Sequence, residues 1–356
     1  SFGTQTRDRV AFQSALDEIA ASESAGTDFS LSVLSSNFDR GIELLADNEL
    51  HPALPANNFP IVQQQTAFAL KGRLTTPSYL AERALNEALF PRNDPTQRDA
   101  TPDTVSKLTL DDVKNYYAAA FRPDLTTIVV IGDVTADQAT ASITKWFGGW
   151  TASGPKPATV LPPVPPNEAS SVNVPNAQRV QDDVTLAETV AMTRSNPDYY
   201  ALVVGNHVLG GGFYATRLYK DVRAEAGLAY SVSNSLDVGK TRATYTVEYG
   251  SDPQNVGKAR SIIVRDIKAM QTAPVTPGEL QIAKALLLRE IPLREASEDT
   301  IARGLLTRSI DELPLDEPTI AARYYADTTA AQIQAAFARW IRPDSFVQIT
   351  EGPPPK

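Results

Sequence analysis

The residues that could do chemistry gather in one stretch, residues 211–230, which reads GGFYATRLYKDVRAEAGLAY. Arg223 closes a charged helical segment in this stretch, and Tyr230 follows seven residues later, after Gly227 has ended the helix. A guanidinium and a phenol held close together can donate hydrogen bonds to an oxygen atom on which negative charge develops. The alternative is purely structural, because cations are favoured at helix C-termini and aromatic residues in strands.

Residues that could hold a metal are scarce. The two histidines, His51 and His207, lie far apart in the sequence, and no HxxEH or HExxH string occurs. The chain has no cysteine, which excludes thiolate catalysis and Cys-ligated metals. We interpret His51 as a loop residue and His207 as a packed or capping residue on an apolar helical face. The sequence therefore predicts no catalytic zinc in this chain.

Composition and charge narrow the classes of function. The net charge of −9 and a pI near 4.9 argue against binding to nucleic acid or to an anionic membrane. No apolar run is long enough to span a bilayer, and 356 residues suggest two domains. Because a cysteine-free, proline-rich chain suits an exported bacterial protein, we expect the bacterial periplasm, with the cytoplasm as the alternative.

Hydrophobic periodicity predicts the elements that position Arg223 and Tyr230. A helix over 196–212 should end in the glycine run Gly210–Gly212, which we interpret as a C-cap turn and not as a phosphate-binding loop. Further strands are predicted at 27–36, 125–133, 179–192 and 345–350, with a hairpin formed by 229–235 and 241–249. Further helices are predicted at 4–22, 38–50, 61–73, 78–90, 108–121, 135–150, 253–271, 277–293, 298–310 and 328–341. The proline-rich residues 151–176 read as a linker between domains at 1–150 and 177–356.

The second half of the chain repeats the first. Residues 108–124 align with residues 328–344 at an offset of 220, and both segments end in Arg-Pro-Asp. In this alignment residues 177–209, a strand and a helix, have no counterpart in the first half. A sheet without them would expose an edge and an apolar face. We therefore expect an incomplete first domain that lacks its N-terminal strand and helix, and whose cover comes from an absent segment or from a partner chain.

The repeat, the phrase FRPDLTTIVVIGDVT at 121–135 and the string LGGGFYATRLYKDVRAEAGLAYSV at 209–232 resemble the insulinase/pitrilysin family of zinc peptidases. This family includes mitochondrial processing peptidase and bacterial two-subunit peptidases. The resemblance covers nearly the whole chain. It implies an α+β fold of two repeated domains, each an antiparallel sheet packed by helices.

The resemblance also implies where zinc should bind. Catalytic members hold zinc with an HxxEH motif and a glutamate well downstream, and the downstream ligand should fall in the helix at 61–73. That stretch reads IVQQQTAFALKGR, and no Asp or Glu occurs between Glu49 and Glu82. The chain thus resembles a non-catalytic subunit of a bacterial two-subunit peptidase.

In such a subunit, the resemblance implies that Arg223 and Tyr230 bind the substrate carbonyl and main chain beside a zinc held by the partner. The partner would be a homologous, zinc-bearing peptidase subunit, and the ligand a substrate peptide. Two alternatives stay open. The chain could be a structural or assembly subunit without a catalytic role, or the body of an active zinc peptidase whose HxxEH segment lies upstream of Ser1.

Overall fold

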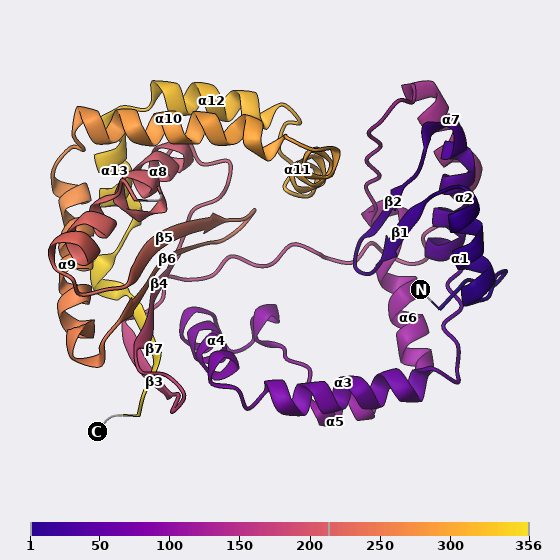
Figure 1. Cartoon of the computed structure of the whole chain (residues 1–356), viewed down its shortest axis with the longest axis horizontal. Coiled ribbons are helices and arrows are strands. Elements are labelled where there is room, and N and C mark those ends of the chain that lie inside the picture. Colours follow the sequence, from indigo (N-terminus) through magenta and orange to yellow (C-terminus); the bar gives the residue numbers. More distant parts are fainter. Residues whose placement is uncertain (1, 213, 355–356) are drawn as a thin grey trace. The chain divides into compact units, whose positions relative to one another are not determined.

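The structure is a computed structural model that describes residues 2–212 and 214–354, and its architecture is α+β, as expected from the sequence (Figure 1). The chain forms two compact units, which we describe separately. Unit 1 comprises Ser1–Lys71, Ala100–Ala158 and Ser297–Thr307, and unit 2 comprises Gly72–Asp99, Thr159–Ala296 and Arg308–Lys356. In the described part of the chain, no helix is both long enough and apolar enough to traverse a lipid bilayer.

Unit 2 is built on a five-stranded sheet with the strand order β3-β7-β4-β6-β5. Its strands are β3 (Ser170–Pro175), β4 (Asp182–Val190), β5 (Ser231–Val238), β6 (Ala243–Ser251) and β7 (Val347–Gly352). Strand β3 pairs with β7 in parallel, and all other neighbours in this sheet are antiparallel. The hairpin predicted from the sequence is confirmed as β5 and β6, in which Ser231 lies opposite Gly250.

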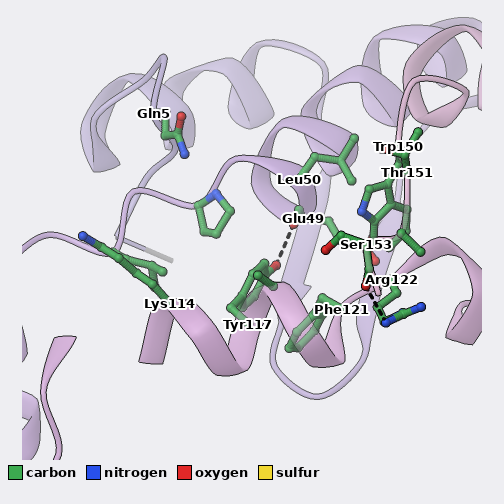
Figure 2. Close-up of a pocket in the computed structure, with 14 residues that line it drawn as sticks. Gln5, Glu49, Leu50, Lys114, Tyr117, Phe121, Arg122, Trp150, Thr151 and Ser153 are labelled. Atoms are coloured by element: carbon green, nitrogen blue, oxygen red, sulfur yellow. Dashed lines mark hydrogen bonds between the residues drawn. The ribbon is translucent and has the colours of Figure 1, made fainter. Parts of the chain in front are cut away.

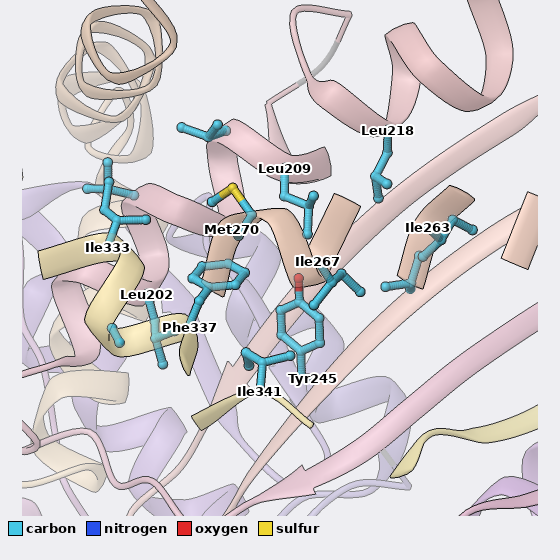
Figure 3. Packing of buried hydrophobic residues seen from close by; sticks show 14 of the residues in the cluster. Leu202, Leu209, Leu218, Tyr245, Ile263, Ile267, Met270, Ile333, Phe337 and Ile341 are labelled. Atoms are coloured by element: carbon cyan, nitrogen blue, oxygen red, sulfur yellow. The ribbon is translucent and has the colours of Figure 1, made fainter. Parts of the chain in front are cut away.

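Helices cover both faces of this sheet, because alternate side chains of a strand point to opposite faces. On one face, Leu186 and Tyr245 pack into a core with helices α8, α9, α10 and α13 (Figure 3). On the other face, Ala187 packs with Leu89 of helix α4. The helices grouped with this unit are α4 (Pro77–Leu89), α8 (Tyr199–Asn206), α9 (Val256–Thr272), α10 (Pro277–Arg294) and α12 (Glu317–Asp327), together with α13 (Ala330–Trp340).

Unit 1 has a smaller sheet, the hairpin of β1 (Ser22–Ala25) and β2 (Phe29–Ser32). Helix α2 lies at its centre, with Leu44 packed toward α1 and Ile42 packed toward α7. The helices of this unit are α1 (Arg9–Glu18), α2 (Phe38–Leu50), α3 (Phe59–Arg73), α5 (Pro102–Ser106), α6 (Leu110–Ala120) and α7 (Ala136–Phe147), and most of α11 (Glu298–Ile310) is also grouped here.

The two halves share local structure where the sequences repeat. Helices α6 and α13 each begin with a capping box, made by Thr109 with Asp112 and by Thr329 with Gln332. A short 3₁₀ turn follows each helix after the Arg-Pro pair. Likewise, a hairpin, a 3₁₀ turn and a helix follow one another as β1–β2–η1–α2 in unit 1 and as β5–β6–η6–α9 in unit 2.

The strand predicted at 125–133 is wrong, because the described residues of this segment form no ladder. Its repeat partner in unit 2 is β7, which lies between β3 and β4 and takes hydrogen bonds from both. Among the described residues of unit 1, no strand corresponds to β3 or to β4, so residues 125–133 have no strand to pair with. Its apolar pattern stays partly exposed at Ile128 (38%) and Ile131 (36%).

Two other expectations need correction. The C-terminal part of the predicted linker forms β3, because Ser170–Pro175 pairs with a strand about 180 residues further along the chain. Helix α12 was not predicted at all, although it begins with proline at its first turn. The domain boundaries at 1–150 and 177–356 stay a prediction.

Candidate functional site

The helical segment that carries Arg223 is η5 (Tyr219–Glu225), a π-helix. π-Helical turns are rare and often occur at functional sites. Val222 on this segment and Leu218 just before it are fully buried in the core of unit 2. The neighbouring position, Arg223, is therefore presented from a backbone that is fixed by packing.

Ion pairs tie η5 to two neighbouring helices. Before its first turn, Arg217 donates two hydrogen bonds to the carboxylate of Glu279, at 2.6 and 2.9 Å. These hydrogen bonds lower the pKa of Glu279 to about 2. In the middle of η5, Asp221 pairs with Arg265 of α9. The segment is thus tied to the start of α10 and to α9.

Gly227 ends the helical segment and turns the chain toward β5. Its φ is +61°, a left-handed conformation that glycine adopts without steric cost. The next residue, Leu228, donates its backbone N–H to the carbonyl of Val222 at 3.0 Å. Tyr230 then donates its backbone N–H to the carbonyl of Gly250 at 2.8 Å, which fixes the start of the strand. This reversal brings the Tyr230 ring back toward Arg223.

Arg223 lies against two aromatic rings. Its guanidinium carbon is 5.4 Å from the ring centre of Tyr230 and 5.1 Å from that of Tyr219, both within cation–π range. Tyr230 is 73% exposed. Within the described part of the chain, the side chain of Arg223 has no hydrogen bond or ion pair. Its N–H groups and the Tyr230 hydroxyl are therefore available to donate to an oxygen of a bound molecule.

The helical run that starts with α8 ends in the glycines before this segment, with Gly212 as the C-cap of η4 (His207–Gly211), as expected from the sequence. None of Gly210, Gly211 and Gly212 adopts the left-handed conformation of a cap glycine. A Cβ on Gly210 would lie 2.6 Å from the side-chain oxygen of Asn234, and a Cβ on Gly211 would lie 2.6 Å from the amide nitrogen of Asn206. The glycines therefore leave room for a buried polar network beneath the site.

That network links three elements of unit 2. The amide of Asn234 on β5 donates to the side-chain oxygen of Asn206 at 2.8 Å and to the phenol oxygen of Tyr245 at 2.6 Å. All three side chains are buried. Because a buried amide is costly unless its hydrogen bonds are made, the network sets the position of β5 against α8.

The histidines do not form a metal site. His207 lies with its Nδ1 3.2 Å from the carbonyl of Val203 and its Nε2 3.6 Å from Glu290, whereas His51 is an exposed residue of unit 1. Among the residues that the structure describes, no cluster of three or more His, Asp or Glu side chains could hold a metal ion. Nor does helix α3, where the downstream ligand was expected, contain any acidic residue.

Helix α3 instead uses its amides for structure. The Gln63 side chain donates to the backbone carbonyls of Val105 at 2.9 Å and Leu108 at 2.8 Å. The residues present therefore do not fit a zinc ion.

The sequence analysis did not assign a role to Tyr219, whose ring forms the second wall beside Arg223. The available signal was its i, i+4 spacing from Arg223, which puts the two side chains on one face of a helix. That spacing alone does not distinguish an aromatic wall from an ordinary surface pair.

Comparisons with known proteins agree on one family. The family model described as "Peptidase M16 inactive domain" matches residues 107–287. A probable inactive metalloprotease of Bacillus subtilis, YmfF, is 25% identical over 266 residues, which cover 71% of this chain and 60% of that protein. A protein of Helicobacter pylori named a non-peptidase homolog is 26% identical over 312 residues, covering 86% of this chain and 70% of its own length.

The fold is similar to that of solved structures. The crystal structure of a peptidase M16 inactive domain from Pseudomonas fluorescens superposes with a TM-score of 0.84 at 22% identity, covering 99% of this chain and 86% of that one. At this level of identity the likeness shows the fold. The chain spans 60% of the length of YmfF, so it matches part of that relative and not all of it.

Proposed function

The chain belongs to the peptidase M16 family, and on that premise we propose that it is a zinc-free subunit of a heterodimeric metallopeptidase. In this role it completes a peptidase chamber and binds substrate peptide through Arg223 and Tyr230. The partner is a homologous subunit that carries the zinc. The observation that carries the proposal is the packing of an otherwise unpaired Arg223 against the exposed Tyr230.

The chemistry of the two side chains suits a peptide carbonyl. A guanidinium offers several N–H donors in a fixed plane, and a phenol offers one O–H donor. When a peptide bond is attacked, negative charge develops on its carbonyl oxygen, and fixed donors stabilise that charge more than they stabilise the ground state. Arg223 and Tyr230 would orient the carbonyl and donate to it.

The proposed division of labour between two chains is supported by the metal-ligating residue types of the described part of the chain, which do not gather into a site. Helix α3 has no acidic side chain, and the described histidines stand apart from any acidic cluster. These features support a subunit whose own residues bind and orient substrate, with the metal chemistry left to the partner. They also count against the alternative of an active peptidase body, because α3 is the helix expected to supply the third ligand.

The proposal is tested by reconstituting the complex with a zinc-bearing partner from the same genome. We expect Arg223→Ala and Tyr230→Phe to lower peptide hydrolysis by roughly 100-fold or more, with assembly unchanged in size-exclusion chromatography. The matched control is Lys220→Ala, which removes an exposed cation from the same helical segment. Full turnover in both site variants would exclude the catalytic role.

A structural or assembly subunit is the second candidate. It is favoured by the similarity to a Helicobacter pylori protein named a non-peptidase homolog. This reading predicts that substitutions of Arg223 and Tyr230 leave hydrolysis by the complex unchanged, and that only changes at the subunit interface alter activity. The reconstitution experiment separates the two candidates in one measurement.

The proposed compartment is the bacterial periplasm, with the cytoplasm as the alternative. The support is compositional, since the chain contains 26 prolines and no cysteine. Fractionation of cells that express the tagged full-length gene, with marker enzymes for each compartment, tests the location.

A further inference from the structure

A cavity within unit 1, separate from the Arg223 site, has a buried carboxyl group in its wall (Figure 2). The cavity has a volume of about 330 Å³. It is lined by the end of α2 and the loop after it, by one face of α6, and by the segment after α7. The carboxyl belongs to Glu49, which is 8% exposed.

The Glu49 carboxylate has no partner. Among the described residues, none donates a hydrogen bond to it and no cation lies within ion-pair distance. The phenol of Tyr117 donates to the backbone carbonyl of Glu49 at 2.6 Å and not to its side chain. Burial raises the pKa of Glu49 to about 7, because nothing compensates the lost hydration of the charge.

At the position of unit 2 that corresponds to Glu49 in the repeat, the chain has an apolar residue, Ile267. Helices α2 and α9 follow equivalent 3₁₀ turns, η1 (Ser35–Asn37) and η6 (Pro253–Asn255). Counted from these turns, Glu49 corresponds to Ile267, which is fully buried in the core of unit 2. A carboxyl at a core position costs stability unless it is paired, so packing does not explain its presence.

Arg122, which also lines the cavity, cannot neutralise Glu49. Its Nε and Nη2 donate to the two carboxylate oxygens of Asp124, at 2.7 and 2.8 Å. Its remaining N–H groups donate to the backbone carbonyls of residues 153, 154 and 155, at 3.0, 3.2 and 3.0 Å. All five N–H donors of the guanidinium are therefore in use.

Three aromatic rings form part of the cavity wall, those of Tyr117, Phe121 and Trp150. Tyr117 and Phe121 stack with ring centres 4.2 Å apart and an interplanar angle of 12°. Figure 2 shows Glu49 between these rings and Trp150. A carboxylate surrounded by aromatic rings suits an organic cation, which gains from the opposite charge and from the faces of the rings.

We infer that this cavity binds a primary ammonium group on an alkyl chain, whose charge Glu49 balances while its carbon atoms rest on Tyr117, Phe121 and Trp150. A lysine side chain and the amino terminus of a peptide share this chemistry. The site is independent of the function proposed for Arg223 and Tyr230, because it lies in unit 1 and uses none of their atoms.

The test measures binding of n-butylammonium chloride to the full chain by isothermal titration calorimetry, with n-butanol as the uncharged control. We expect saturable binding of the amine alone, weakened about 10- to 100-fold in Glu49→Gln, the range expected when a hydrogen bond to a charged group is lost. Glu18→Gln, which removes an exposed carboxylate from α1, is the matched control and should bind like the wild type. Lysine Nα-acetyl amide and alanine amide then separate the two sources of the ammonium group.

The pH dependence gives a second readout. Affinity should rise between pH 6 and pH 8, because Glu49 ionises in this range while an alkylammonium ion stays charged. The other charged or titratable groups that face the cavity are Lys114, Arg122 and Tyr117. Burial raises the pKa of Tyr117 above its usual value, and the hydrogen bonds to Asp124 raise the pKa of Arg122. Equal affinity in Glu49→Gln, a flat pH profile, or no saturable binding to the wild-type chain would overturn the inference.

Discussion

Arg217 and Glu279 form a two-point ion pair, with N–O distances of 2.6 and 2.9 Å, that ties the segment before Arg223 to the first turn of α10. Glu279 also closes the capping box of that helix with Thr276. The Glu279 carboxylate therefore fixes both the start of α10 and the residues that lead into η5. Bidentate pairs of this kind are among the stronger polar contacts in proteins.

Replacing Glu279 should destabilise unit 2. We expect Glu279→Gln to lower the free energy of unfolding by about 1–3 kcal/mol at pH 7, measured by urea unfolding followed through Trp340 fluorescence. Because the folded pKa of Glu279, about 2, lies below the ordinary glutamate value of 4.5, the stabilisation is present above pH 4.5. It should disappear as the pH falls toward 2.

The control for this prediction is Glu225→Gln. Glu225 pairs with Lys220 at 3.5 Å on the same helical segment, and both side chains are more than 60% exposed. Exposed pairs contribute little, so we expect a change below about 0.5 kcal/mol. Equal losses in the two variants would show that the Arg217–Glu279 pair has no special role.

The left-handed conformation of Gly227 should make it the residue of the turn least tolerant of a side chain. We expect Gly227→Ala to cost about 1–2 kcal/mol in urea unfolding, because φ is +61° although the space around its Cβ position is open. Gly257→Ala in α9 is the control, since its surroundings are equally open and its φ is not left-handed. That change should stabilise the protein by about 0.5–1 kcal/mol.

The guanidinium of Arg223 should matter for its shape as well as for its charge. In the reconstituted complex we expect Arg223→Lys to lose most of the kcat/KM that Arg223→Ala loses, because an ammonium group lacks the planar set of donors. Arg289→Lys, at an exposed position on α10, should leave kcat/KM unchanged. Wild-type kinetics in Arg223→Lys would reduce the role of Arg223 to charge alone.

The buried carboxyl of Glu49 should make unit 1 less stable as the pH rises. The folded pKa of Glu49, about 7, lies above the ordinary glutamate value of 4.5. The unfolded chain therefore releases this proton at lower pH than the folded chain, and stability falls as the pH rises from 4.5 to 7. We therefore expect Glu49→Gln to be more stable than the wild type by about 1–3 kcal/mol at pH 8, with a smaller gain at pH 4. Trp150 fluorescence during urea unfolding reports on this unit.

Comparing the wild type with this variant cancels other titrating groups. Glu188, whose pKa burial also raises to about 7, lies in unit 2 and is present in both chains. A gain that does not depend on pH would indicate that packing, and not the charge of Glu49, sets the difference in stability.

Local signals in the sequence sufficed for the elements that carry the candidate site. Gly227 predicted the end of the helix that bears Arg223, and the alternating residues after it predicted the hairpin that Tyr230 enters. The α+β class was also predictable, because both halves carry strand and helix periodicities together with a common repeat.

Features that depend on distant partners were not predictable. Residues 125–133 have the pattern of a buried strand, yet a strand exists only where neighbours supply its hydrogen bonds. Conversely, Ser170–Pro175 looks like linker and becomes a strand because β7 lies beside it. Glu49 reads as an ordinary polar residue near a helix end, and only the three-dimensional packing shows that its carboxyl is buried.

The place of β7 in the sheet has a consequence for biosynthesis. It is the most C-terminal of the described strands, yet it lies between β3 and β4, so the ribosome must deliver residues 347–352 before those two strands can be joined. Until then the edges of β3 and β4 that pair with β7 in the finished sheet would lack their hydrogen-bonding partner. Unit 2 should therefore acquire its protease resistance late in translation, in a single step, when residues 347–352 leave the exit tunnel.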